Sequence, residues 1–403
     1  MYGRGSDPSC PVITLWIVAI GGAFWWLLQG VCIVRTVRSV RPLLAGTIES
    51  PPVGDAPLVS VICPARDEAD AIEAAVVARL ADASPWLEFI FVDDRSADGT
   101  GEILDRAVAA DARCHVVHNQ DLPEGWLGKV HAQQVGVLEA TVREDGWYLF
   151  SDGDTHVLPG AIEAAMAFAT REQADHVAMT PRIVRAPWLL GLCLAPLMRV
   201  LISTLRLWQA NDDSSPRAFG VGAFNLVRRS ALDHAGGLEQ LRMEIADDVG
   251  IGQIIKDSGG RSRLVTGEGW CEIQWYRTNA QFLAGSEKGA GKARTRGNLF
   301  VTLVLLAFVL TLDVSPLVLL AWLPTPPAML ASATAALALC LSLTVAARFS
   351  LPRWWSLAWP IGVMACGCVA ARAMMLAFKH GGIRWRGDDH TLKSTSDGER
   401  VRL

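Results

Sequence analysis

Residues 12 to 34 form an uncharged apolar run, and this run constrains the fold more than any other feature of the chain. As a helix that rises about 1.5 Å per residue, it is long enough to cross a bilayer core of roughly 30 Å. A signal peptide has a shorter apolar stretch that follows its basic residues, whereas here Arg35, Arg38 and Arg41 come after the run. We therefore predict a membrane anchor. The positive-inside rule predicts that the domain after it lies in the cytosol.

Three more apolar runs follow Asn298 and predict a C-terminal membrane region over residues 296–380. The runs cover residues 299–323, 328–347 and 354–378. Three spans would carry the basic end of the chain out of the cytosol, which conflicts with the positive-inside rule. Asp313 and the Ser315-Pro316 step leave an alternative open, in which the first run is a re-entrant or interfacial segment.

The composition fits one large domain together with several membrane segments, because 51% of the residues are hydrophobic and only 19% are charged. The net charge of -4 provides no basic field that would attract nucleic acid, so a nucleic-acid partner is not expected. The nine cysteines do not form paired CxxC motifs at zinc-site spacing, and we interpret them as free thiols in a reducing compartment.

Residues 58 to about 180 alternate between short β-rich runs and helical stretches, a pattern typical of βαβ units around a mostly parallel sheet. Strands are expected at residues 58–65, 87–94, 114–119, 146–154 and 176–182. We therefore predict an α/β fold. The chain divides into a tail (1–11), an anchor (12–34), a linker (35–57), an α/β domain (58–295), the membrane region (296–380) and a polar tail (381–403).

Residues 187–208 are strongly apolar, yet they contain Arg199 and Arg206, which are seven residues apart and so share one face of a helix. An arginine in the middle of a bilayer is costly. We therefore predict a helix that belongs to the α/β domain and lies in the membrane interface. A buried core helix is the alternative.

Acidic and polar residues follow three of the predicted strands. Pro64-Ala65-Arg66-Asp67-Glu68 ends the first, and Asp93-Asp94-Arg95-Ser96 ends the second. Ligands of open α/β sheets bind beyond the carboxyl ends of the strands, and an acid there can bond a base edge or a ribose hydroxyl. Both segments also suit the structural capping of helices, which is the alternative interpretation.

The fourth strand ends in Ser151-Asp152-Gly153-Asp154-Thr155. Alternate residues of an extended strand face the same side, so both acids would approach one site. Two nearby carboxylates repel each other unless a cation lies between them, and their hard oxygen atoms suit Mg²⁺ or Mn²⁺ bound together with substrate phosphates. The alternative is a solvated acidic turn.

Taken in order, these elements resemble the family 2 glycosyltransferases of the GT-A fold over about residues 58–295. The resemblance rests on the motifs PARDE, VDDRSADGT, WLGKVHA, SDGDT, GAFNLVRRSAL and EIADDVGIG. It implies a Rossmann-like domain that uses a nucleotide-sugar, here a UDP-sugar, and a divalent metal. Within the family, WLGKVHA and the apolar segments look most like the hopanoid-associated branch and its relatives, the ceramide glucosyltransferases and carotenoid glycosyltransferases.

The resemblance implies a role for each matching residue of the donor site. Ala65, Arg66 and Glu68 would line the nucleotide pocket, Asp94 would contact the uracil or ribose, and Lys129 would lie near the nucleotide.

Two acid pairs complete the implied site. Asp152 and Asp154 match the DXD motif, with Asp152 nearer the sugar and ribose and both acids available to the metal. In EIADDVGIG the resemblance places the general base on Asp248, with Asp247 as its neighbour, at the start of a helix. An inverting transfer needs such a carboxylate to accept the proton of the attacking hydroxyl.

One motif departs from the processive members of the family. They would show QxxRW, whereas this chain has Gln274-Trp275-Tyr276-Arg277. Either Arg277 or Lys288 is a candidate clamp for the diphosphate. The departure argues against a polymerising synthase and so favours transfer of a single sugar. The resemblance to the hopanoid-associated branch implies a lipid acceptor, and the apolar runs predict a multi-pass protein of the inner membrane. A processive synthase, a polyprenyl-phosphate sugar transferase and a non-enzymatic scaffold are the alternatives.

Overall fold

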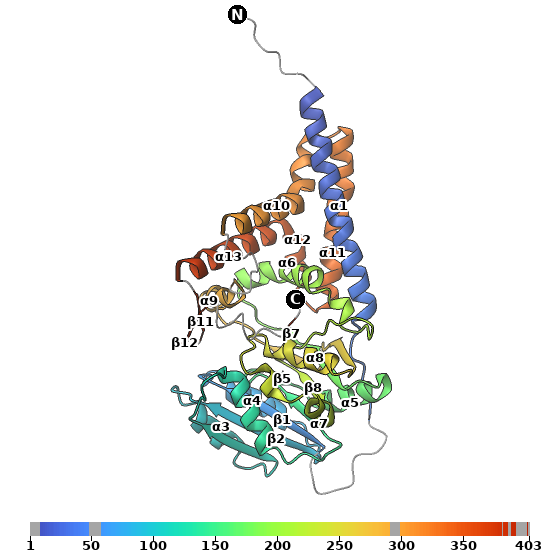
Figure 1. The fold of residues 1–403 in the computed structure, drawn as a ribbon. Coiled ribbons are helices and arrows are strands. Elements are labelled where there is room, and N and C mark those ends of the chain that lie inside the picture. The colour runs from blue at the N-terminus through green and yellow to red at the C-terminus, as the bar shows by residue number, and fades with distance from the viewer. Residues whose placement is uncertain are drawn as a thin grey trace, which may run out of the picture. The chain divides into compact units, whose positions relative to one another are not determined.

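The computed structural model describes residues 9–47, 58–290, 299–380, 382–385, 388–391 and 401. The chain forms two compact units (Figure 1). One unit comprises residues 1–37, 186–206 and 276–392 and consists mainly of apolar helices. The other comprises residues 38–185, 207–275 and 393–403 and contains the α/β sheet. Predictions for the N-terminal tail before residue 9, for the linker from residue 48 and for most of the polar tail lie outside the described residues.

A seven-stranded sheet forms the centre of the α/β unit. Its strands are β1 (Val59–Ala65), β2 (Leu87–Asp94), β3 (Cys114–Asn119), β4 (Trp147–Phe150), β6 (His176–Thr180), β8 (Asn225–Arg228) and β9 (Ser262–Thr266). Their order is β3-β2-β1-β4-β8-β6-β9. Strand β8 is antiparallel to both of its neighbours, and the other neighbouring pairs are parallel. The predicted mostly parallel sheet is therefore confirmed.

A smaller sheet packs short strands together in the order β5-β10-β7. These strands are β5 (His156–Val157), β7 (Arg182–Ile183) and β10 (Cys271–Ile273). Strand β10 is antiparallel to β5 and parallel to β7.

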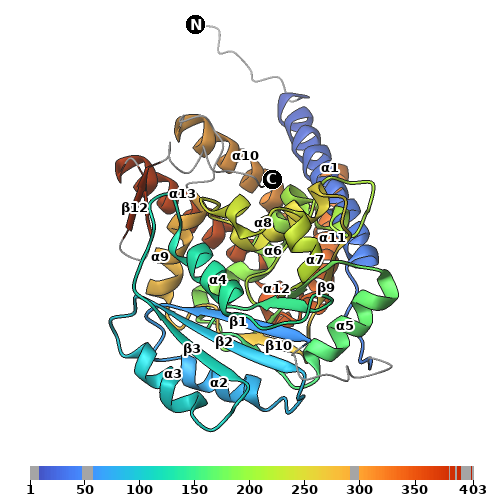
Figure 2. The same ribbon diagram turned by 60° about the horizontal axis from the view of Figure 1, so that its bottom comes forward.

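Helices cover both faces of the large sheet because the central strands β1, β2 and β4 are buried along their whole length and carry apolar side chains on both faces. They are α2 (Ile72–Leu80), α3 (Thr100–Val108), α4 (Gly128–Glu139), α5 (Ala161–Glu172), α7 (Arg229–His234) and α8 (Asp247–Asp257), with 3₁₀ turns at Leu207–Gln209 and Leu238–Leu241. Val61 and Phe89 pack with α2, α3 and α5, whereas Ile62 and Phe150 pack with α4, α7 and α8. Figure 2 shows α2 and α3 on one side of β1–β3 and α4 on the other.

Strand β4 ends at Phe150 rather than at residue 154, which corrects the predicted strand. Beyond it the chain turns, because the Thr155 N–H donates to the Asp152 carbonyl at 3.1 Å. The Asp152 N–H donates to the Gly222 carbonyl at 2.9 Å. Asp152 and Asp154 therefore lie in a turn, and the argument from alternate residues of a strand does not apply to them.

The second unit contains the long apolar helices and a hairpin. They are α1 (Ser9–Ser39), α6 (Trp188–Leu205), α9 (Asn279–Ala290), α10 (Leu299–Val318), α11 (Pro326–Arg348), α12 (Arg353–Leu357) and α13 (Trp359–His380), a 3₁₀ turn at Leu319–Trp322, and the strands β11 (Gly382–Trp385) and β12 (Asp388–Thr391). In the described part of the chain, five helices are long and apolar enough to cross a membrane: Val12–Ser39, Trp188–Leu205, Leu303–Trp322, Pro326–Arg348 and Trp359–Leu376. Helix α10 continues through Asp313 and Pro316, so these residues do not interrupt it.

Helix α6 belongs to the unit of apolar helices, whereas the sequence pattern predicted that it belongs to the α/β domain. Its Arg199 is 4% exposed and donates from both terminal nitrogens to the Asp313 carboxylate of α10, at 3.1 to 3.2 Å. The Trp25 indole N–H also donates to Asp313, at 3.2 Å. The guanidinium carbon lies 4.5 Å from the centre of the Trp26 ring. This pairing offsets the cost of burying Arg199 and explains why α6 packs among apolar helices.

Arg206 does not share a helical face with Arg199, which is a second correction. Helix α6 ends at Leu205, and Arg206 follows it as an exposed residue with a φ of 52°.

We expect the Asp313→Ala variant to be destabilised by about 3 kcal/mol or more, because it leaves the Arg199 guanidinium buried without its carboxylate. The double variant Arg199→Met/Asp313→Leu should recover part of this loss. Thermal unfolding of the detergent-solubilised protein measures both. Arg206→Met is the control, because Arg206 is exposed. Equal melting temperatures for Asp313→Ala and Arg206→Met would contradict the role of the ion pair.

Candidate active site

The loops after β1 and β2 are hydrogen-bonded to each other, so the two strand ends lie side by side. The Asp67 N–H donates to the Ser96 hydroxyl at 3.1 Å, and the Glu68 N–H donates to the Thr100 hydroxyl at 2.8 Å. Ala65 is the last residue of β1 and is buried, and Arg66 follows it half-buried. The residues predicted to line the nucleotide pocket therefore lie at the carboxyl edge of the sheet.

Asp94 ends β2 and is 3% exposed. Its two carboxylate oxygens accept bonds from Arg95 Nε and Nη2, both at 2.9 Å, and the Asn119 amide donates to Oδ1 at 3.0 Å. A methyl group at Gly128 would lie 2.5 Å from Arg95 Nη2, so α4 begins directly against this pair. Asp94 thus fixes the orientation of Arg95, a residue that the sequence analysis did not select. Direct contact between Asp94 and a nucleotide stays a prediction.

Lys129 joins two of the predicted acids. Its ammonium nitrogen lies 2.7 Å from Asp152 Oδ1 and 3.1 Å from Asp247 Oδ2, and about a third of the side chain (34%) is exposed. Partial burial opposes the charge on Lys129. The negative charges of Asp152, Asp247 and Asp248 outweigh burial and raise the pKa of the ammonium above its ordinary value. Lys129 therefore compensates the charge of an acid cluster drawn from two separate segments.

The acid pair Asp247-Asp248 begins helix α8, as predicted. Asp247 is 5% exposed and also accepts a bond from the Gln133 amide at 3.2 Å. Asp248 directs its carboxylate differently. Its Oδ2 accepts from the Gly222 N–H at 3.1 Å and its Oδ1 from the Val249 N–H at 2.9 Å. The two neighbouring acids therefore have separate partners and separate orientations.

Gly222 connects the two acid segments. Its carbonyl accepts from the Asp152 N–H, and its N–H donates to Asp248 Oδ2. A methyl group at this position would lie 2.5 Å from Asp152 Oδ2, and one at Gly220 would lie 1.7 Å from the Asp248 carbonyl oxygen. Only glycine permits these approaches. The sequence analysis quoted GAFNLVRRSAL as a motif but selected no residue from this segment. Gly220 and Gly222, two residues apart in the sequence, could have indicated a close approach of the backbone here.

A buried histidine supports the same segment. His176 is fully buried, with Nδ1 2.8 Å from the Ser262 hydroxyl and Nε2 3.0 Å from Asn225 Oδ1. The Asn225 amide in turn donates to the Asp248 carbonyl at 3.1 Å. Because Asn225 donates through its amide nitrogen, the neutral Nε2–H form of His176 satisfies this chain of bonds. Sequence reasoning missed both His176 and Asn225.

The residues at this edge fit a divalent cation held together with phosphate. Asp152 and Asp154 supply hard carboxylate oxygens from one turn, and Asp152 is half-buried rather than enclosed. Among the described residues, no group of three or more His, Cys, Asp or Glu side chains could hold a metal ion. Mg²⁺ and similar ions are commonly bound by one or two carboxylates, with waters and substrate phosphates as the other ligands. The donor set suits that mode.

The candidate diphosphate clamps do not belong to the α/β unit. Arg277 lies in the segment 276–392, which groups with the apolar helices, and its backbone N–H donates to Gln281. Lys288 belongs to helix α9, but its side chain lies outside the described residues. Both roles stay predictions.

The α/β unit is similar to a known protein family. Residues 60–235 match the model for Glycosyl transferase family 2. Apart from residues 186–206, the matched residues belong to the α/β unit, which is therefore similar to this family over that range.

Two individual proteins are similar to the chain. It is 45% identical over 113 residues to TuaG of Bacillus subtilis (strain 168), a glycosyltransferase assigned to teichuronic acid biosynthesis. That match covers 28% of this chain and 42% of the relative's length. The solved mannosyltransferase PcManGT from Pyrobaculum calidifontis, in complex with GDP-Man and Mn²⁺, superposes with a TM-score of 0.53 at 19% identity. The superposition covers 88% of this chain and 98% of that one. The predicted GT-A fold is therefore confirmed.

We expect the protein to lose stability as the pH falls from 6.5 towards 4, partly because of His176. Burial lowers the pKa of this histidine from 6.5 to about 4. Between these values the unfolded chain binds the proton and the folded chain does not, so unfolding is favoured by up to about 3 kcal/mol. Denaturant unfolding at several pH values measures the slope.

The variant His176→Asn should be less stable at neutral pH and should show a shallower loss of stability in acid. His234→Asn is the control, because His234 is exposed. An unchanged pH slope in His176→Asn would contradict this assignment.

Proposed function

We propose that the chain is a membrane-bound, inverting glycosyltransferase that transfers a single sugar from a UDP-sugar to a lipid acceptor. The observation that carries the proposal is the bonded cluster at the sheet edge. There Lys129 bridges Asp152 and Asp247, and Gly222 bridges Asp152 and Asp248. In this proposal the turn of Asp152 and Asp154 binds the metal, and the general base lies beside it.

The donor would bind along the carboxyl edge of β1 and β2. In this proposal Ala65, Arg66 and Glu68 line the nucleotide, and Arg95 is held towards it by Asp94. Asp152 and Asp154 would hold Mg²⁺ or Mn²⁺, which when bound neutralises charge on the diphosphate leaving group. Lys129 adds a fixed positive charge beside Asp152.

Asp248 is the proposed general base. Backbone N–H groups donate to both of its oxygens, which fixes the orientation of the carboxylate. It would accept the hydroxyl proton as that oxygen attacks the anomeric carbon, opposite the departing diphosphate. Lys129 and Gln133 engage Asp247, which therefore serves to position Lys129 rather than to take the proton.

A lipid acceptor is supported by the apolar helices. Among the residues that the structure describes, five helices are long and apolar enough to cross a membrane, and the basic residues after the first favour a cytosolic α/β unit at the inner membrane. An acceptor dissolved in the bilayer would then meet a soluble donor near the membrane surface. The hopanoid-associated branch, which the sequence resembles, provides the first acceptors to test.

The variant Asp248→Asn should lose at least about a hundredfold in turnover, because an amide cannot accept the hydroxyl proton. Nucleotide affinity should stay near that of the wild type, since the proposed role of Asp248 is to accept the proton of the acceptor hydroxyl and not to bind the nucleotide. Asp233→Asn is the matched control, because the Asp233 side chain is 62% exposed. Normal turnover in Asp248→Asn would remove the base assignment.

The variant Asp154→Ala should lose both activity and its response to added Mn²⁺. Activity of the wild type should fall when a chelator is present in excess and return when Mn²⁺ is restored. A titration of sugar transfer against free Mn²⁺ measures both effects. Full wild-type activity in excess chelator would show that the metal role is wrong.

The donor and acceptor can be assigned in one assay. Membranes containing the protein are supplied with UDP-sugars or GDP-sugars together with total membrane lipids. Released nucleotide and new glycolipids are then measured by mass spectrometry. UDP release with a singly glycosylated lipid is the expected result. GDP release would reassign the donor, since the fold neighbour was solved with GDP-Man. A high-molecular-weight glycan would indicate a processive synthase instead.

A further inference from the structure

Arg79 is a buried cation directly behind the turn that carries Asp152 and Asp154. It lies on helix α2 and is 2% exposed. Its Nη2 donates to the Asp152 carbonyl at 2.5 Å and to the Ser151 hydroxyl at 3.1 Å, and its Nη1 donates to the Gly153 carbonyl at 3.2 Å. All three acceptors belong to consecutive residues of the acid-bearing turn.

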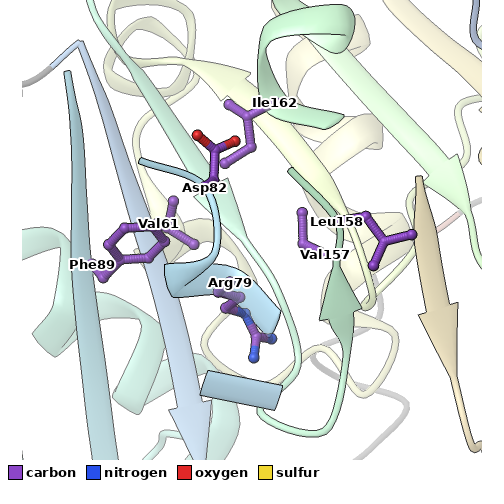
Figure 3. Close-up of a pocket in the computed structure, with 7 residues that line it drawn as sticks. All are labelled: Val61, Arg79, Asp82, Phe89, Val157, Leu158 and Ile162. Atoms are coloured by element: carbon purple, nitrogen blue, oxygen red, sulfur yellow. The ribbon is translucent and has the colours of Figure 1, made fainter. Parts of the chain in front are cut away.

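Most of the side chains that line the space beside Arg79 are apolar. A small cavity beside it is lined by Val61, Phe89, Val157, Leu158 and Ile162 together with Asp82. Figure 3 shows the Arg79 guanidinium group directed away from Asp82. Within the described part of the chain, Arg79 forms no ion pair with a carboxylate, and its Nε has no hydrogen-bond partner. Burying a cation in this way is costly unless nearby negative charge offsets it.

The nearby negative charge comes from the acids of the turn. The buried thiol of Cys271 is sensitive to both sides of this arrangement: burial raises its pKa to about 12, Arg79 lowers it, and Asp152 and Asp154 raise it. The charges of the guanidinium and of the two acids therefore act in opposite directions on this thiol. Arg79 contacts the peptide groups of the turn, whereas Lys129 contacts the Asp152 carboxylate itself.

We propose that Arg79 is a positioning residue for the divalent-cation site. It fixes the peptide groups of residues 151–153 from behind the turn, and its charge reduces the repulsion between Asp152 and Asp154. The two carboxylates are thereby kept at a spacing that a divalent cation can use. An arginine is required because its planar fork supplies several donors in fixed directions, whereas a lysine offers a single charged nitrogen. The inference rests on the proposed metal site.

The test measures Mn²⁺ binding to the full-length protein in detergent with UDP present, by electron paramagnetic resonance of the free ion. In Arg79→Gln the dissociation constant for Mn²⁺ should rise by about tenfold or more, as expected for a residue that orients metal ligands. Arg79→Lys keeps the charge but loses the fork, so its Mn²⁺ affinity should fall between those of Arg79→Gln and the wild type. Thermal unfolding without metal is measured in parallel.

Arg113→Gln is the matched control. Arg113 also donates to two backbone carbonyls, those of Asp82 and Ser84, but it does not contact the acid-bearing turn. This variant should lose thermal stability and keep wild-type Mn²⁺ affinity. If Arg79→Gln does not fold, the Mn²⁺ affinity of Arg79→Lys is compared with that of the wild type instead.

The outcomes separate the two proposals. Mn²⁺ binding by the wild type with unchanged affinity in a folded Arg79 variant would overturn the role of Arg79 alone. Failure of the wild type to bind Mn²⁺ would overturn the metal site of the proposed function and the role of Arg79 with it.

Discussion

The structure of the site depends on the compensation of negative charge at the carboxyl edge of the sheet. Asp152, Asp247 and Asp248 come from two distant segments, and like charges brought together in this way repel. Lys129 holds two of them through contacts of 2.7 and 3.1 Å, while backbone N–H groups hold the third. Arg79 adds a buried positive charge behind the turn. Without these cations the acids would be forced apart or into solvent.

Close backbone approach is the second requirement of the site. Gly222 and Gly220 allow the segment before β8 to contact Asp152 and Asp248, at distances that leave no room for a side chain. Asn225 and His176 then fix that segment from the sheet, through bonds that end on the Asp248 carbonyl. The position of the proposed base is therefore set by buried polar groups that do not themselves reach the edge of the site.

Compensation of charge is also required in the unit of apolar helices, where a buried cation pairs with a buried carboxylate. Arg199 of α6 is tolerated because Asp313 of α10 faces it, with Trp25 donating to the same carboxylate. Local sequence predicted the cost of this arginine but not its partner, which lies 114 residues further along the chain. For this reason α6 was predicted in the wrong unit. The predicted position of α6 in the membrane interface stays a prediction.

The sequence alone determined the class of fold and most of the proposed site residues. Apolar runs predicted β1, β2, β3 and the long apolar helices, because the spacing of apolar residues within a short stretch of sequence indicates the type of secondary structure. Tertiary structure decided the rest. Only the folded chain shows that Lys129 bridges Asp152 and Asp247, that Arg79 lies behind the turn, and that His176 supports Asp248 through Asn225. These contacts join residues far apart in the sequence, and hydrogen bonds and ion pairs of this kind leave no periodic pattern from which they could be predicted.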